Sequence, residues 1–148
     1  MEKRRLGRTD LFVSRICLGT MTFGEQNTEQ EGHEQLDLAF GRGVNFIDTA
    51  ELYPIPPRPD TQGRTERTIG SWMKSRGTRD KVVLATKVYG NMGPDGEAWP
   101  NHDKLSAVNI RRAVDASLKR LGTDYIDLCQ FHHIDRNTPL EEDRKSVV

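Results

Sequence analysis

The sequence predicts a parallel α/β fold in which four strands alternate with three helices. Four short apolar runs recur along the chain, an amphipathic stretch separates each run from the next, and glycines or prolines lie at the boundaries. Crossovers between such strands are almost always right-handed. This alternation alone fits both half of a (β/α)8 barrel and a doubly wound sheet. Residues 19–24 (G-T-M-T-F-G) lack the G-x-G-x-x-G pattern that would favour the doubly wound sheet.

The first predicted elements are a hairpin, a strand and a helix. Residues 4–14 contain a turn-forming glycine and aspartate, which fits a short hairpin. Residues 16–19 form an apolar run that predicts a buried strand. Thr28 and Glu31 have the spacing of a capping box, so we expect a helix to begin at Thr28. It should end near residues 41–43, where two glycines permit a left-handed turn.

The middle of the chain contains two further strands and a second helix. Residues 44–48 and 81–87 are apolar runs typical of buried strands, and residues 65–76 predict an amphipathic helix between them. The segment 53–59 contains four prolines, which fix φ and lack an amide donor, so we expect a loop there. Residues 88–103 are rich in glycine and proline and predict a long irregular loop.

The third helix has the clearest pattern. One face collects apolar and small residues at i, i+3 and i+4 spacing: Ile110, Ala113, Val114, Ser117, Leu118 and Leu121. Gly122 is expected to end this helix, and residues 125–131 follow as the fourth strand.

Length and charge limit the kind of protein that this can be. A chain of 148 residues suits one domain. Its 22 Lys+Arg balance its 22 Asp+Glu, so no net charge attracts nucleic acid or an anionic membrane. No apolar run approaches the roughly 20 residues of a membrane span, and no hydrophobic segment follows the basic N-terminus. We therefore expect a cytoplasmic protein that acts on small molecules, with no nucleic acid or membrane as partner.

The two cysteines, Cys17 and Cys129, each lie inside an apolar run that predicts a strand. A disulfide scaffold or a zinc site would need more cysteines at closer spacing. We expect both to be buried free thiols in a reducing compartment.

Polar residues follow successive predicted strands. Asp48 ends the second strand, Lys87 ends the third, His132 follows the fourth, and Tyr53 lies in the loop after Asp48. Each has an ordinary alternative explanation: a turn-forming aspartate, a solvated lysine, a histidine packed at the rim. In a parallel barrel, however, the carboxyl ends of the strands form one face, so we expect the four to converge there.

Four segments resemble the aldo-keto reductase family. Residues 18–24 (LGTMTFG) look like its first-strand motif, and residues 43–53 (GVNFIDTAELY) are similar to the motif that carries its Asp and Tyr. Thr86-Lys87 matches the position of its catalytic lysine, and residues 117–132 (SLKRLGTDYIDLCQFH) match the segment leading to its histidine.

The resemblance is most specific to a bacterial, Tas-type subgroup of that family, which residues 24–27 and 53–59 resemble. It implies that the chain is the N-terminal half of a (β/α)8 TIM barrel with four parallel strands, three helices and an N-terminal hairpin. It also implies NADPH-dependent reduction of aldehydes or ketones to alcohols.

The resemblance implies a role for each of the four residues. A carbonyl accepts hydride at carbon only when its oxygen is polarised and then protonated, and the family pattern makes Tyr53 the proton donor. A free phenol is a weak acid at neutral pH, and a neighbouring Lys87 ammonium stabilises the phenolate and strengthens that acid. Asp48 would pair with Lys87 and orient it, and His132 would hydrogen-bond the substrate oxygen or help to protonate it.

The cofactor contacts implied by the resemblance are Gly19, Thr20 and Met21, which would lie beside the nicotinamide of NADPH. A turn that simply ends the strand is an equally good explanation of Gly19. Tyr89 and Trp99 follow the third strand and would line a substrate pocket or pack within their loop. Most of the cofactor-binding residues of the family lie beyond the segments matched here.

The last residues depart from the family pattern. Residues 1–142 resemble a partial aldo-keto reductase domain, whereas residues 143–148 (D-R-K-S-V-V) do not look like its next helix. We interpret this hexapeptide as translated sequencing-adapter read-through, with a frameshift or a natural truncation as the alternatives. A full barrel needs about 250 residues, so we expect this polypeptide alone to be marginally stable, to self-associate and to reduce no carbonyl.

Two other functions remain open at the sequence level. Some relatives in the family bind cofactor without turnover, as channel β-subunits do. A metal-dependent hydrolase using His132 and His133 would need further ligands at suitable spacing. Side chains alternate along a strand, so we expect only His132 of this pair to face the site.

Overall fold

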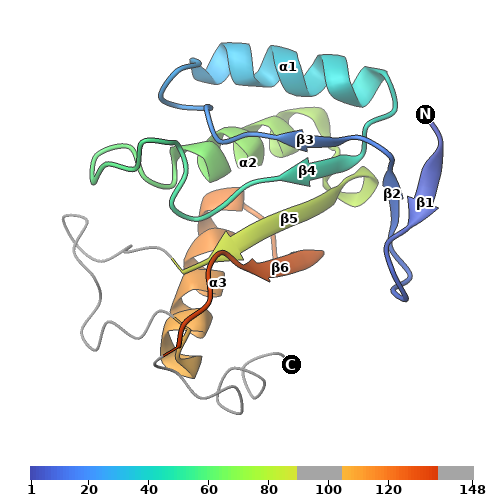
Figure 1. The fold of residues 1–148 in the computed structure, drawn as a ribbon. Coiled ribbons are helices and arrows are strands. Elements are labelled where there is room, and N and C mark those ends of the chain that lie inside the picture. The colour runs from blue at the N-terminus through green and yellow to red at the C-terminus, as the bar shows by residue number, and fades with distance from the viewer. Residues whose placement is uncertain (90–104, 137–148) are drawn as a thin grey trace.

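The N-terminal hairpin forms as predicted. The computed structural model describes residues 1–89 and 105–136. Strand β1 (Lys3–Arg5) pairs antiparallel with β2 (Phe12–Ser14). Figure 1 places this hairpin at the end of the molecule where the strands of the main sheet begin, so it lies away from their carboxyl ends.

The main sheet contains four parallel strands in the order in which they occur along the chain. These are β3 (Cys17–Gly19), β4 (Phe46–Asp48), β5 (Val83–Val88) and β6 (Leu128–Phe131). Each strand pairs with its sequence neighbour in parallel register. All four carboxyl ends therefore lie at the same edge of the sheet.

Three helices connect these strands: α1 (Glu29–Gly41), α2 (Arg64–Arg76) and α3 (Ala107–Leu121). They cover the same face of the sheet, and the strands lie in front of α2 in Figure 1. A doubly wound sheet has helices on both faces and reverses its strand order. The sequential order and the single helical layer match a (β/α)8 barrel as a partial chain, which confirms the predicted fold class.

The predicted helix boundaries are also confirmed. Thr28 caps α1, and the Glu31 carboxylate accepts the Thr28 amide at 2.7 Å, which completes the capping box. Helices α2 and α3 end at Gly77 and Gly122, with φ of 60° and 65°. Only glycine adopts this left-handed conformation at low cost, so these two residues determine where the helices stop.

The core lies between the helical layer and the sheet. Its fully or nearly buried members come from the loop after β3, α1, α2, strands β4 and β5, the turn before β5 and the end of α3: Phe23, Leu36, Ile47, Ile69, Trp72, Met73, Val82, Leu84 and Leu121. The one polar atom of the buried Trp72 indole has a hydrogen-bond partner, because Nε1 donates to Asp37 Oδ1 at 2.8 Å.

A buried polar contact joins α2, α3 and β5. Glu66 on α2 is fully buried, and its carboxylate accepts from the Thr86 hydroxyl at 2.7 Å and from Arg120 Nε at 2.6 Å. A buried carboxylate is tolerated only when it is paired and hydrogen-bonded, as it is here. Glu66 therefore connects the helical layer to the strand that carries Lys87.

The expectation of buried cysteines is wrong. Cys17 and Cys129 are free thiols, as predicted, but both are exposed. They lie on β3 and β6, which are the two edges of the four-stranded sheet, so neither is enclosed by a strand on each side. Partial burial of the sulfur, and next the charge of Asp48, raise the pKa of the Cys17 thiol to about 11.

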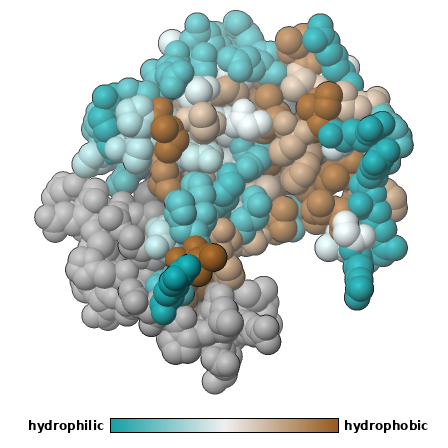
Figure 2. Space-filling model, in the orientation of Figure 1, coloured by the Kyte–Doolittle hydropathy of each residue, from teal (hydrophilic) through white to brown (hydrophobic). Residues whose placement is uncertain are grey.

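The prediction of a buried first strand also fails, because Cys17 and Gly19 are exposed and Leu18 is only half-buried. The helices cover one face of the sheet, and Figure 2 shows apolar surface on the side where the strands lie in front. The second and third strands begin two residues later than predicted and the fourth begins three residues later, and residues Arg79–Lys81 before the third strand form a 3-10 turn. The predicted long loop lies outside the described residues except at its start.

No helix within the described ranges 1–89 and 105–136 combines the length and the apolar character needed to cross a membrane.

Candidate active site

The four residues singled out in the sequence meet at the carboxyl edge of the sheet. Asp48 is the last residue of β4, Lys87 is the last but one of β5, and His132 directly follows β6. Tyr53 lies in the loop after β4. Because the strands are parallel and adjacent, their ends bring side chains that are distant in sequence to one place.

The Lys87 ammonium lies at the centre of this group. Its Nζ donates to Asp48 Oδ1 at 2.6 Å and also contacts Oδ2, and it donates to the Thr49 carbonyl at 2.9 Å. Its third near neighbour is the Tyr53 hydroxyl, 3.5 Å away. The Lys87 and Asp48 side chains are 14% and 26% exposed, so this ion pair is largely shielded from solvent.

His132 also lies against Tyr53. The two ring centroids are 5.6 Å apart and the ring planes meet at 81°, an edge-to-face arrangement. Lys87 Nζ lies 4.9 Å from the Tyr53 ring centroid. The structure thus brings all four predicted residues together around the phenol of Tyr53.

The backbone around Tyr53 is anchored on both sides. The Tyr53 amide donates to the Ala50 carbonyl at 3.2 Å, and the Tyr53 carbonyl accepts the Gly63 amide at 2.8 Å. Gly63 adopts φ of 78° just before α2, and a Cβ there would lie 2.6 Å from Arg120 Cδ. Glycine is therefore required at the point where the start of α2 holds the Tyr53 loop.

The environment of His132 favours the neutral imidazole. Burial has the largest effect and lowers its pKa below the ordinary value, and the charges of Lys87 and His133 act in the same direction. Asp48 opposes them. Among the described residues, His132 Nδ1 is buried without a hydrogen-bond partner. A neutral ring can donate from one nitrogen and accept at the other, which suits contact with a polar oxygen.

His133 does not follow the expected alternation. The strand ends at Phe131, so the two-residue period no longer governs the next side chains. The His133 ring stacks on His132 with a centroid distance of 5.2 Å and also lies 5.0 Å from the Tyr89 ring. The two imidazoles therefore lie side by side, and the ring contact with Tyr53 is made by His132. The other predicted loop aromatic, Trp99, lies outside the described residues.

The three predicted cofactor contacts differ in their surroundings. Gly19 pairs with Asp48 across the sheet, and a Cβ at Gly19 would meet nothing within 4 Å. Met21 is half exposed. Thr20 is fully buried, and its hydroxyl donates to the Asp48 carbonyl at 2.9 Å. Within the described part of the chain, the backbone of Gly19 is therefore open to the approach of another group. The Thr20 side chain is already engaged in holding β3 to β4.

Sequence reasoning missed Glu51, which lies between Asp48 and Tyr53. Only 2% of this residue is exposed, and its Oε1 accepts the Tyr89 amide at 2.8 Å. The only sequence signal was an acidic residue inside the second-strand motif. Loop carboxylates are usually solvated, so this signal could not be distinguished from a surface residue.

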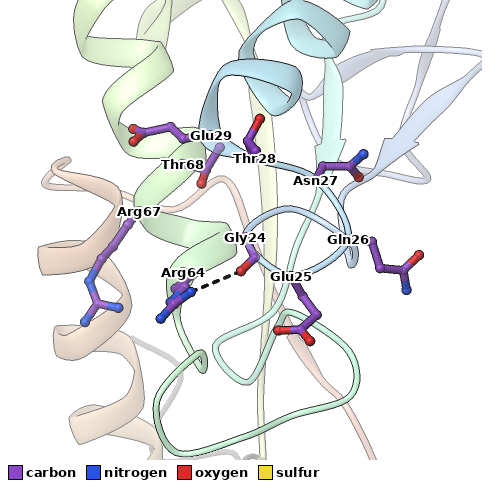
Figure 3. A pocket seen from close by; sticks show the side chains of 9 residues that line it. All are labelled: Gly24, Glu25, Gln26, Asn27, Thr28, Glu29, Arg64, Arg67 and Thr68. Carbon is purple, nitrogen blue, oxygen red and sulfur yellow. Dashed lines mark hydrogen bonds between the residues drawn. The ribbon is translucent and has the colours of Figure 1, made fainter.

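A separate hollow of about 460 Å³ lies between the starts of α1 and α2 (Figure 3). Loop residues 24–29 line one side of it, and Arg64, Arg67 and Thr68 line the other. Figure 3 shows Arg64 donating to the Gly24 carbonyl. None of the four residues around Lys87 lines this hollow.

A metal-dependent hydrolase would need further ligands beside His132 and His133. Within the part of the chain that the structure describes, no group of three or more His, Cys, Asp or Glu residues is arranged to hold a metal ion.

Comparison with known sequences identifies the class to which this fold and site belong. The sequence profile of the Aldo/keto reductase family matches residues 15–146. Protein Tas of Escherichia coli (strain K12) is 48% identical over 138 residues, which cover 93% of this chain and 40% of Tas. The "uncharacterized oxidoreductase YrpG" of Bacillus subtilis (strain 168) is 46% identical and is aligned over 96% of this chain and 43% of its own length.

A solved structure shows the same arrangement. The holo form of the aldo-keto reductase AKR11C1 from Bacillus halodurans superposes with a TM-score of 0.81 at 36% sequence identity. The match covers 99% of this chain and 45% of that protein. The chain belongs to the aldo/keto reductase family, and its similarity to Tas confirms the resemblance to that bacterial subgroup. It spans about two fifths of the length of the curated relatives that it matches.

Proposed function

We propose that the complete protein containing this chain reduces aldehydes or ketones to alcohols with NADPH, with Tyr53 as the proton donor. One observation carries this proposal: the Lys87 ammonium lies 2.6 Å from an Asp48 carboxylate oxygen and 3.5 Å from the Tyr53 hydroxyl. An ammonium at this distance lies where it can stabilise the negative charge that remains on the phenol oxygen after proton transfer.

Each residue has a separate task in this chemistry. Tyr53 transfers its hydroxyl proton to the oxygen of the reduced carbonyl. Lys87 stabilises the phenolate that remains, and the Asp48 carboxylate with the Thr49 carbonyl holds the ammonium in place. The neutral His132 ring, edge-on to Tyr53, hydrogen-bonds the carbonyl oxygen and orients it toward the phenol.

The bound nicotinamide supplies the hydride, since no amino acid side chain can do so. Gly19 and Met21 would contact it from the end of β3, where the backbone is exposed beside Asp48. Thr20 would take part through its backbone, because its hydroxyl is engaged with Asp48. The choice of NADPH as the cofactor rests on membership of the family. The cytoplasmic location, and the small-molecule carbonyl as the one partner, likewise remain predictions.

The experiment is a Tyr53→Phe substitution in the complete protein, assayed with NADPH and a panel of aldehydes and ketones. We expect kcat to fall by about a hundredfold or more, because the general acid is lost, while cofactor affinity measured by fluorescence stays unchanged. Tyr125→Phe is the matched control, since Tyr125 is exposed and its hydroxyl lies near the Arg79 carbonyl, away from the site.

The alternative is a non-catalytic, cofactor-sensing protein of the channel β-subunit kind. If the unsubstituted protein binds NADPH but turns over no carbonyl in the panel, this alternative replaces the reductase proposal. Turnover that persists in Tyr53→Phe would leave the family assignment intact and remove Tyr53 from the role of proton donor.

A further inference from the structure

Glu51 contacts the segment around Lys87 at two points. Its amide donates to the Lys87 carbonyl at 3.2 Å, and its carboxylate accepts the Tyr89 amide at 2.8 Å. The residue is almost fully buried. It lies three residues after Asp48 and two before Tyr53, so it connects the loop that carries the phenol to the strand that carries the ammonium.

The backbone bonds explain why a side chain is needed at this point. Thr49 donates to Ala85 at 2.9 Å and Glu51 donates to Lys87, so the parallel ladder continues past the end of β4. In a regular parallel ladder, the next bond would join the residue-89 amide to the residue-51 carbonyl. The Glu51 carboxylate takes that amide instead. The backbone is thereby free to leave the sheet after residue 51 and to place Tyr53 over Lys87.

The same bond holds Tyr89 in an unusual conformation. Tyr89 has φ of 141°, a value that residues with a side chain rarely adopt. Its ring lies 5.0 Å from the ring of His133, which stacks on His132. The Glu51 carboxylate therefore supports the contacts on the histidine side of the site as well as those on the lysine side.

We propose that Glu51 is a positioning residue, whose buried carboxylate ties the Tyr53 loop to residues 87–89 and so sets the distance between the Tyr53 phenol and the Lys87 ammonium. The proposal rests on the reductase function proposed above. Glu51 does not touch the reacting atoms, and it acts through the placement of Tyr53 and Lys87.

The test compares Glu51→Gln with Glu51→Ala in the complete protein. Glutamine keeps an acceptor oxygen for the Tyr89 amide, whereas alanine removes it. We expect Glu51→Ala to lower kcat by about tenfold or more through misplacement of the phenol, and Glu51→Gln to retain most of the activity. Glu34→Ala on the exposed face of α1 is the control and should leave kcat unchanged.

Two further measurements separate positioning from a merely structural role. The described charged and titratable groups facing Tyr53 are Asp48 from β4, Lys87 from β5 and His132 after β6, and all three remain in each variant. A less well placed phenol transfers its proton less effectively in the transition state without weakening substrate binding, so in Glu51→Ala kcat should fall while KM stays within about twofold. Hydrogen exchange at the Tyr89 amide should accelerate in Glu51→Ala and stay slow in Glu51→Gln.

The outcomes distinguish the two proposals. If the unsubstituted protein reduces no carbonyl, the proposed function fails. If it does turn over, but Glu51→Ala leaves kcat unchanged, the positioning role is overturned and the reductase function stands. A fall in kcat of equal size in both Glu51 variants likewise overturns it, because that result indicates general destabilisation.

Discussion

At the scale of single residues, the Lys87–Asp48 ion pair lies close to two aromatic rings, those of Tyr53 and His132. The Lys87 ammonium lies beside the Tyr53 phenol and also acts on His132, where it adds to the effect of burial. Asp48 holds that ammonium and partly offsets its effect on the imidazole. Burial and the Lys87 ammonium therefore both favour the neutral form of His132, and Asp48 acts against them.

The His132 titration tests this description. Its pKa is lowered first by burial and next by Lys87, and Asp48 raises it. We expect Lys87→Met to move the His132 midpoint upward and Asp48→Asn to move it further down. Imidazole NMR resonances, assigned with a His132→Asn variant, measure both shifts. Lys74→Met on the exposed side of α2 should change nothing. Opposite shifts from Lys87→Met and Asp48→Asn are the essential result, and parallel shifts would contradict the assigned charges.

The sequence was sufficient to single out Asp48, Lys87 and His132 at strand ends and Tyr53 in the loop after β4, because all four lie within recognisable motifs. Glu51 was beyond reach, since its importance depends on the course of the backbone after β4. The position of the His133 ring was beyond reach for a related reason: His132 and His133 both follow the end of the fourth strand at Phe131, so the two-residue period of the strand does not orient them.

At the scale of elements, the helical layer depends on the close approach of α2 to α3. A Cβ built at Gly70 on α2 would lie 2.6 Å from the Leu121 carbonyl oxygen and 2.8 Å from that of Arg120. Real Cβ atoms do not approach backbone oxygen so closely, so α3 ends directly against a glycine. The same pair of helices holds the Glu66–Arg120 ion pair behind β5.

Gly70→Ala should destabilise the complete protein although alanine is the better helix former. The intrinsic gain is about 1 kcal/mol, whereas overpacking against backbone costs about 1–3 kcal/mol and cannot be relieved by a side-chain rotation. Gly41→Ala is the matched control, because it ends α1 in open space and should change stability by less than about 0.5 kcal/mol. Urea unfolding of both variants measures the difference, and equal midpoints would show that α2 and α3 are further apart.

Element boundaries were predictable where a local signal sets them. The Thr28–Glu31 capping box starts α1, and Gly77 and Gly122 stop the next two helices, as the structure confirms. The start of β5 was misjudged, because a 3-10 turn over Arg79–Lys81 has no distinct sequence signature. Burial of β3 was misjudged because it depends on neighbours that the local sequence does not specify.

At the scale of the whole molecule, the order of the strands distinguishes the two architectures that the sequence left open. Alternating strands and helices fit a barrel or a doubly wound sheet equally well, and a list of elements does not specify which strand pairs with which. The observed order β3-β4-β5-β6, with helices on a single face, identifies the barrel. This arrangement leaves β3 and β6 as edges and their exposed cysteines uncovered.

The 148-residue polypeptide, expressed by itself, should therefore self-associate and reduce no carbonyl. The complete protein should reduce carbonyls and should not associate through these surfaces. Among the described residues, the sheet of the 148-residue polypeptide has two edge strands and one face without a helical cover, and both promote association between chains. Sedimentation velocity at several concentrations, together with binding of a hydrophobic dye, measures the association of each protein. An NADPH-oxidation assay at equal molar concentration measures turnover. A monodisperse 148-residue monomer that oxidises NADPH with an aldehyde would contradict this prediction, because it would mean that four strands alone assemble a working site.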